Sequence, residues 1–338
     1  MKHPIFALLV SLPLVFLCSG CAPTAKEYRD TTFFAMDTYL TVRLAQSGIA
    51  EDTLDDISSE CERLVRELES VLSAHDPSSE LYALNVSESE YTEISESLET
   101  VLLTAYKICE ITNGAYDCTL GTLADLWNIT GGGPVPAQAD IDAVLAHTGY
   151  NKITIDERRN TVMHPDPEVS IDLGGIGKGA AADVLVQYLE TTEIPYGLVS
   201  VGGTIGVFGE KSDGTSYKIG IRDPDDPSGI VGYLLIDEGF VAVSGDYERY
   251  FEENSVRYHH IFDPSTGYPA DSGLRETAVH CLSGAAADAL STALFVMGTD
   301  ASLALYETDG GFEAVLVSDT GITATPGAQT ELLTTQTP

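Results

Sequence analysis

Positive charge is scarce in this sequence. Only 17 of the 338 residues are Lys or Arg, against 52 that are Asp or Glu, so the formal net charge is −35. Proteins that bind nucleic acids neutralise phosphates with clustered Lys and Arg, and this composition argues against such a partner. Apolar residues make up 43% of the chain, which is enough to bury a core, and the length allows one large domain or two.

Cysteines are also few, and their spacing is uninformative. Cys18 and Cys21 lie close to the N-terminus, and four more follow in the rest of the chain: Cys61, Cys109, Cys118 and Cys281. None of the intervals between these four matches a CxxC pair or a zinc knuckle. We therefore expect buried thiols or one incidental disulfide, and no zinc site.

The clearest apolar run lies at the N-terminus. Lys2 and His3 precede apolar residues 4–17, and a Ser-Gly pair then leads to Cys21. A run of about fourteen residues is too short to span a bilayer, and its order is that of an export signal. The Ser-Gly-Cys sequence resembles a bacterial lipobox, so we expect a signal peptide at 1–20 and a lipid on Cys21 that anchors the chain at the outer face of the cytoplasmic membrane, or in the periplasm. A secreted protein or an uncleaved anchor are the alternatives.

Hydrophobic periodicity predicts an α+β fold with a mainly antiparallel sheet. Apolar residues at helical spacing indicate helices, and alternation indicates strands. The predicted helices cover 54–72, 94–112, 137–147, 178–190, 284–297 and 300–307. The predicted strands cover 32–44, 152–156, 161–164, 169–173, 197–208, 217–222, 231–236, 240–244, 258–263 and 276–282. Residues 21–31 are expected to form a tether, and 326–338 a loose tail.

A glycine-rich turn follows the predicted strand at 169–173. Asp172 ends this strand, and the glycines at 174, 175, 177 and 179 surround Lys178, where a helix is expected to begin. Such a turn lets a ligand approach the backbone, and a helix N-terminus favours anions. The segment is no Walker A loop, because Gly179 stands where that loop has Ser or Thr. Phosphate binding and a purely structural turn both remain open.

Two polar residues interrupt the predicted apolar helix at 284–297. Asp288 and Thr292 are four residues apart, so their oxygens lie on one face of the helix. A carboxylate in such surroundings needs a partner or a cation, and hard oxygen donors suit Mg²⁺ or Ca²⁺. The alternative is an Asp that only interacts with the start of the helix.

Two adjacent histidines, His259 and His260, precede an Asp-Pro-x-Thr-Gly turn. A histidine is suited to act as a general base near neutral pH, although a structural role is the usual interpretation of either histidine alone. On a strand, neighbouring side chains point to opposite faces, so one histidine is expected to be sensitive to substitution and the other tolerant. Arg249, upstream, is positioned to meet an anion or an acidic neighbour.

Taken together, these segments resemble the ApbE family of FAD:protein FMN transferases. The resemblance rests on seven segments in order along the chain: 34–38, 73–85, 114–121, 172–179, 244–247, 260–267 and 287–292. It implies an ApbE-like domain over 32–325 that transfers FMN from FAD to a threonine hydroxyl of a partner flavoprotein, in the presence of Mg²⁺, with release of AMP. Hydrolysis of FAD to FMN and AMP is an alternative, and a non-enzymatic flavin-binding lipoprotein is another.

The resemblance also implies roles for individual residues. His260 is the expected catalytic base, and the Mg²⁺ ligands are the Gly175 carbonyl, Asp288 and Thr292. The expected FAD-binding residues are Met36, His75, Tyr116, Asp117, Asp172, Lys178, Ser244 and Ile261. This chain departs from the family at His75, where some members have an aromatic residue, and at Thr204 and Ser291, where acidic or amide side chains occur. The first two departures affect expected cofactor contacts, and Ser291 implies a metal site with one fewer carboxylate and more water or phosphate oxygens.

Overall fold

The computed structural model describes residues 28–46, 48–226 and 228–333. The predicted signal peptide and Cys21 lie outside the described residues. The main element is an eight-stranded sheet in which every neighbouring pair is antiparallel, in the order β1-β2-β6-β7-β10-β13-β14-β15. Its strands are β1 (Tyr28–Ala35), β2 (Thr38–Ala45), β6 (Gly197–Val201), β7 (Thr204–Phe208), β10 (Gly239–Gly245), β13 (Leu274–Cys281), β14 (Glu313–Ser318) and β15 (Gly321–Ala324). The predicted α+β class with mainly antiparallel sheet is confirmed.

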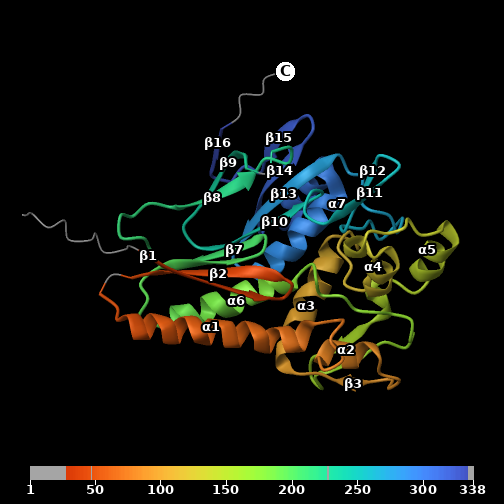
Figure 1. Cartoon of the computed structure of the whole chain (residues 1–338). Coiled ribbons are helices and arrows are strands. Elements are labelled where there is room, and N and C mark those ends of the chain that lie inside the picture. The colour runs from red at the N-terminus through yellow and green to blue at the C-terminus, as the bar shows by residue number, and fades with distance from the viewer. Residues whose placement is uncertain (1–27, 47, 227, 334–338) are drawn as a thin grey trace, which may run out of the picture.

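Helices cover one face of this sheet, and a smaller sheet covers the other (Figure 1). The helices are α1 (Glu51–Leu72), α3 (Glu96–Ile111), α6 (Gly177–Glu190) and α7 (Gly284–Asp309), and the small sheet has the order β16-β9-β8, with β8 (Tyr217–Arg222), β9 (Ile230–Ile236) and β16 (Thr330–Leu332). Successive side chains of β10 point to opposite faces of the main sheet, so this strand contributes to the cores on both sides. Phe240 and Ala242 join the core beneath the helices, whereas Val241 joins the core shared with the small sheet.

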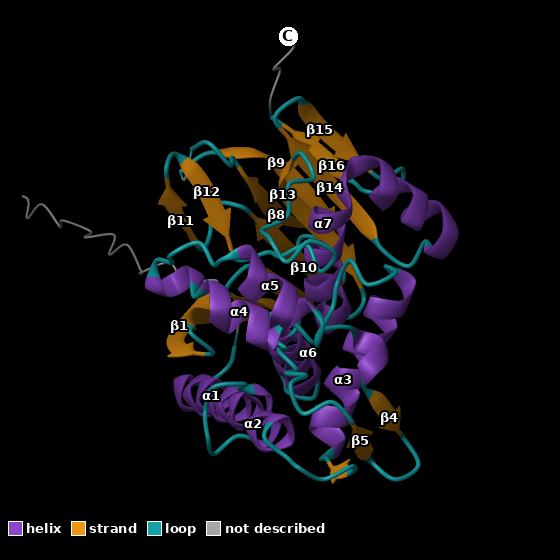
Figure 2. Ribbon diagram, turned by 90° about the vertical axis from the view of Figure 1, so that its right-hand side faces the viewer, coloured by secondary structure: helices purple, strands orange, loops and turns teal. Residues whose placement is uncertain are grey.

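The remaining elements lie on the side of the molecule that faces the viewer in Figure 2. They are α2 (Glu80–Asn85), α4 (Gly121–Trp127), α5 (Gln138–Leu145), the short helices η1 (Ile129–Gly131) and η2 (Tyr150–Lys152), and the strands β3 (Thr92–Glu93), β4 (Thr154–Asp156), β5 (Thr161–Met163), β11 (Tyr250–Glu253) and β12 (Val256–His259). Those around α4 and α5 form a lobe with a core of its own. Trp127 is fully buried in this lobe, and its indole N–H donates to the Gly267 carbonyl at 2.8 Å. This contact ties the 263–267 turn to α4.

Several sequence-based boundaries are wrong. The strands predicted at 32–44 and 197–208 are both hairpins, because Met36 and Asp37 (φ 51° and 55°) and Gly202 (φ 56°) turn the chain. Residues 169–173 form no strand and contribute one isolated bridge, from Ser170 to Leu120. The strand predicted at 258–263 is also misplaced: β12 covers Val256–His259, and the chain continues beyond it as a loop.

Both ends of the predicted domain also differ from the expectation. Strand β1 begins at Tyr28, inside the expected tether, because its register pairs it with β2 along its whole length. The expected loose tail contains β16, which pairs with β9. The two helices predicted at 284–297 and 300–307 are both present: they form the two halves of α7, which meet at a kink at Gly298 (φ 76°). Helix α7 is long and apolar enough to cross a membrane, but it packs against α6, β10 and β13 as a core helix.

Candidate active site

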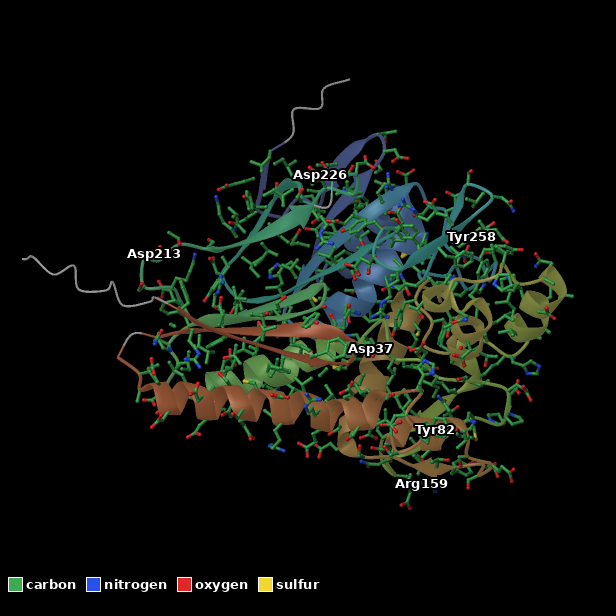
Figure 3. All side chains as sticks on the ribbon, viewed as in Figure 1. Asp37, Tyr82, Arg159, Asp213, Asp226 and Tyr258 are labelled. Carbon is green, nitrogen blue, oxygen red and sulfur yellow. The ribbon has the colours of Figure 1, made fainter. Side chains whose placement is uncertain are left out.

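A cavity of about 980 Å³ opens where the main sheet, the helices and the α4–α5 lobe meet. Its lining comes from segments far apart in the sequence. All the predicted site residues except Met36 line it: His75, Tyr116, Asp117, Asp172, Gly175, Lys178, Ser244, His260, Ile261, Asp288 and Thr292. Asp37, at the tip of the β1–β2 hairpin, also lines it (Figure 3). The fold thus gathers residues that the sequence singled out separately.

Met36 lies behind this wall. Its methyl group lies 3.4 Å from where a β-carbon at Gly177 would stand, so it packs on the first turn of α6. Its backbone N–H donates to Glu69 Oε1 at 2.7 Å, which fixes the hairpin tip against α1. Met36 therefore supports the turn that carries Asp37 into the cavity.

Asp288 is the most deeply buried charged group of the cavity, with 2% of its surface exposed. Its Oδ2 accepts a hydrogen bond from the Gly179 backbone N–H at 3.0 Å, and its Oδ1 lies 3.5 Å from Lys178 Nζ. Burial raises the pKa of Asp288, and the Lys178 charge opposes this shift. The helix keeps a desolvated carboxylate at the cavity wall with one cation beside it.

Neutral oxygens surround this carboxylate. Thr292 Oγ1 lies 3.3 Å from Ser244 Oγ, which in turn lies 2.8 Å from Ser291 Oγ. A β-carbon at Gly175 would lie 3.7 Å from Thr292 Oγ1, so this backbone passes directly beside the threonine. Hydroxyl, carbonyl and carboxylate oxygens of this kind fit a hard cation such as Mg²⁺. Within the described residues no group of three His, Cys, Asp or Glu side chains is placed to hold a metal, so the fit rests on one carboxylate.

The glycine-rich turn places Lys178 and the start of α6 at the cavity. Asp172 Oδ1 accepts the Gly174 backbone N–H at 2.7 Å, and Lys178 Nζ reaches the Gly174 carbonyl at 3.2 Å. At Gly179, a β-carbon would overlap the carbonyl of Gly284 at the start of α7. This position therefore requires glycine, and the close crossing brings Lys178 to Asp288.

Tyr116 and Asp117 play different parts. The Tyr116 hydroxyl is buried without a hydrogen-bond partner in the described part of the chain, and burial raises its pKa well above the usual value. It is therefore a free donor at the wall. The Asp117 carboxylate is engaged within the protein, because it accepts the backbone N–H groups of Thr119 and Tyr150 at 2.8 and 2.9 Å. It shapes the loop, whereas Tyr116 remains available to a ligand.

The two histidines lie in different surroundings, and only His259 belongs to a strand. His259 ends β12, is buried, and has its Nε2 3.1 Å from the Ala270 carbonyl. His260 follows the strand and lines the cavity, with its Nδ1 3.3 Å from the Arg249 carbonyl. A carbonyl only accepts, so Nδ1 carries the proton of this contact and Nε2 keeps a free lone pair. Burial, followed by the Lys178 and Arg249 charges, lowers the pKa of His260 to about 3.

The cavity also contains residues that motif reasoning missed: Arg222, Tyr247 and Glu248. Arg222 ends β8, and burial raises the pKa of Glu248 while the charges of Lys178 and Arg222 oppose the shift. Tyr247 ends the 244–247 segment but was given no role, and Arg222 and Glu248 lie outside the seven segments, so the fold is what places the three side chains at the cavity. His75, in contrast, was predicted but is exposed, 3.9 Å from exposed Asp125.

Comparison with known proteins agrees with this geometry. The model of the ApbE family matches residues 36–316. A FAD:protein FMN transferase of Vibrio cholerae is 34% identical over 307 residues, which cover 88% of this chain and 90% of that protein, and one of Treponema pallidum is 34% identical over 275 residues, 75% of each. The crystal structure of the ApbE protein of Thermotoga maritima superposes with a TM-score of 0.81 at 34% identity, covering 88% of this chain and 97% of that one. The flavin transferase ApbE of Vibrio cholerae superposes with a TM-score of 0.78 at 31% identity, covering 90% and 97%.

Proposed function

This chain belongs to the ApbE family, and we propose that it is a FAD:protein FMN transferase that attaches FMN to a threonine hydroxyl of a partner flavoprotein and releases AMP. The observation that carries the proposal is the single cavity that combines Asp288, Thr292 and the Gly175 backbone with Lys178 and His260. Transfer of FMN from FAD agrees with the names of its curated relatives. Threonine as the acceptor and Mg²⁺ as the cofactor are our own inferences.

The residues around Asp288 would hold the Mg²⁺. Asp288, Thr292 and the Gly175 carbonyl supply one carboxylate and two neutral oxygens, which leaves room for diphosphate oxygens and water. A bound Mg²⁺ would offset the diphosphate charge and polarise its P–O bonds. Lys178 adds a second positive charge at this wall, which an anionic ligand needs in a protein of net charge −35.

His260 would accept the proton of the attacking hydroxyl. Its Nδ1–H donates to the Arg249 carbonyl, so the unprotonated Nε2 is the basic atom. The acceptor oxygen bonds to the phosphorus on the FMN side of the diphosphate, the bridging P–O bond breaks, and AMP leaves. Burial lowers the pKa of His260 most, and the Lys178 and Arg249 charges lower it further; bound diphosphate would offset the effect of these charges and make the imidazole a stronger base.

We also propose that the protein is exported and anchored through lipid on Cys21. The short apolar run at 4–17 and the Ser-Gly-Cys sequence support this placement. An acceptor on the outer side of the membrane would then be within reach.

The decisive experiment incubates the purified protein with FAD and Mg²⁺, with and without a flavoprotein subunit that carries an acceptor threonine. Transferase activity yields one covalent flavin on the acceptor for each AMP released, whereas a hydrolase releases FMN and AMP without acceptor. A chelator should stop both reactions. FAD that binds but stays intact under every condition would identify a flavin-binding protein and refute the proposal.

A further inference from the structure

A buried carboxylate on the main sheet has an unsatisfied oxygen next to the cavity wall. Glu276 lies on β13, opposite Gly245 of β10, and its side chain is fully buried. Its Oε2 accepts the hydroxyl of Tyr247, and its Oε1 has no hydrogen-bond partner among the described residues. A half-satisfied buried carboxylate destabilises a fold, so its presence calls for a role other than stability.

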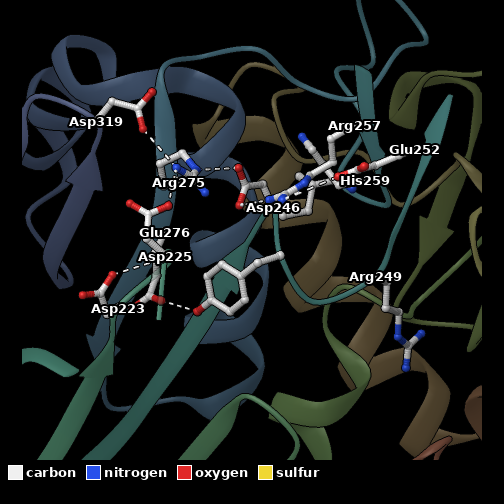
Figure 4. Close-up of polar contacts among 12 residues, drawn as sticks. Asp223, Asp225, Asp246, Arg249, Glu252, Arg257, His259, Arg275, Glu276 and Asp319 are labelled. Atoms are coloured by element: carbon white, nitrogen blue, oxygen red, sulfur yellow. Dashed lines mark hydrogen bonds and ion pairs between the residues drawn. The ribbon is translucent and has the colours of Figure 1, made fainter. Parts of the chain in front are cut away.

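Tyr247 is held on three sides. Its ring lies over Gly245, where an added β-carbon would stand 2.6 Å from the ring, so a side chain there would displace it. Glu276, labelled in Figure 4, accepts the hydroxyl. The Arg222 guanidinium carbon lies 5.7 Å from the ring centroid. Tyr247 and Arg222 both line the cavity, whereas Glu276 lies behind them.

Arg222 is a cation without an ion pair within the described part of the chain. Arg275, in contrast, pairs with Asp225, Asp246 and Asp319 (Figure 4). The Arg222 charge acts on the carboxyl groups of Glu248 and Glu276 without forming an ion pair with either, so the guanidinium remains available for an anionic ligand. Stacking on an aromatic ring is a common way to fix the plane of a guanidinium.

We propose that Glu276 is a positioning residue: it holds the Tyr247 ring against Gly245, and the ring holds Arg222 at the cavity wall, where the guanidinium binds a phosphate of the dinucleotide. This inference rests on the proposed function for the identity of that ligand. Glu276 itself does not touch the ligand.

The charge state of Glu276 gives a second readout. Burial raises the pKa of Glu276 to about 7, against the Tyr247 hydrogen bond and the Arg222 charge, and Glu248 adds to the increase. Between pH 8 and pH 6 the carboxylate gains a proton and becomes a weaker acceptor for the Tyr247 hydroxyl. The affinity for FAD should therefore fall over this range in the parent protein, and this dependence should be smaller in Glu276→Gln.

The test measures dissociation constants for FAD and for riboflavin, which lacks phosphate, by flavin fluorescence in the same Mg²⁺ buffer. Glu276→Gln, Tyr247→Phe and Arg222→Gln should each weaken FAD binding about tenfold and leave riboflavin binding unchanged. Because the three residues act through one contact, Glu276→Gln with Arg222→Gln should weaken FAD binding no more than about twofold beyond Arg222→Gln alone. Tyr217→Phe, which removes a tyrosine hydroxyl bound to the Phe208 carbonyl outside this cavity, is the matched control.

The outcomes separate this inference from the proposed function. If the parent protein binds FAD and the three variants bind it equally well, Glu276 is only structural and the inference is wrong. The same conclusion follows if FAD and riboflavin binding weaken together, since that indicates general distortion of the cavity. A parent protein that binds no FAD refutes the proposed function as well.

Discussion

His260→Ala offers the sharpest test of the proposed chemistry. A general base contributes about 10² to 10⁴ in rate, equivalent to roughly 3–5 kcal/mol of activation free energy, so turnover should fall by that factor. FAD should still bind, because diphosphate recognition is assigned to the Asp288 site and Lys178. The assay is single-turnover transfer with an acceptor subunit, followed by AMP release and covalent flavin fluorescence. Transfer at the parent rate in a folded His260→Ala protein would exclude this histidine as the base.

The pH dependence provides a separate check on the same residue. With the pKa of His260 lowered to about 3, its imidazole is neutral across the working range. The kcat/KM profile, which reports the free enzyme, should therefore show no acid limb near pH 6.5 that depends on His260. An acid limb near 6.5 that disappears in His260→Ala would contradict the structural environment described for this side chain.

The lowered pKa of His260 should also make the stability of the substrate-free protein depend on pH. A histidine whose pKa is lower in the folded than in the unfolded state destabilises the fold as pH falls below about 6.5, because the unfolded chain binds the proton more readily. The effect should grow between pH 6.5 and about 3 and should be smaller in His260→Ala. Thermal unfolding of both proteins at pH 7 and pH 5 measures it, and an equal loss of Tm in the two would contradict it.

The control for these experiments cannot be His259. Its buried ring contacts the Ala270 carbonyl and the ring of Phe295, so His259→Ala should lower stability instead of being tolerated. His280→Ala is better matched, because His280 lies on β13 outside the cavity and its imidazole has one hydrogen bond to the described part of the chain, at the Glu238 carbonyl. It should transfer FMN at the parent rate.

Three further substitutions test other parts of the molecule. Asp288→Ala should abolish FAD turnover and remove the Mg²⁺-induced rise in Tm; activity that still depends on Mg²⁺ in this variant would refute the assigned ligand. Gly179→Ala should lower the free energy of unfolding, measured by chemical denaturation, by about 3 kcal/mol, because its β-carbon would overlap the backbone of Gly284. Stability equal to that of the parent protein would mean that α6 and α7 can move apart with little loss of free energy. Cys21→Ala should move the protein from the membrane to the soluble fraction, whereas a processed variant that stays on the membrane would rule out the lipid anchor.

The sequence predicted those parts of the site that depend on local spacing. Asp288 and Thr292 share a face because helical geometry requires it, and the structure places both at the cavity. The prediction missed the turn between β1 and β2, because Met36 and Asp37 adopt positive φ angles although no glycine marks the turn in the sequence. It also failed at 169–173, where apolar alternation resembled a strand.

Contacts between distant strands left no local signal. Glu276 begins the strand predicted at 276–282, where no local pattern marks it as functional, and only the pairing of β13 with β10 places it next to Tyr247. Arg222 is brought to the cavity by the small sheet, whose third strand, β16, was expected to be a loose tail. Such residues become recognisable only when the three-dimensional arrangement is known.

The early start of β1 limits how far a lipid-anchored form of this enzyme can work from its membrane. Tyr28 is already paired in the main sheet, so only seven residue steps separate it from Cys21. Even fully extended, the tether between these two residues measures about 25 Å. If the chain is anchored at Cys21, Tyr28 stays within about 25 Å of the lipid surface. Strand β1 then extends about 26 Å further, to the hairpin tip beside the cavity. An acceptor must therefore present its threonine within the combined reach of the tether and this strand.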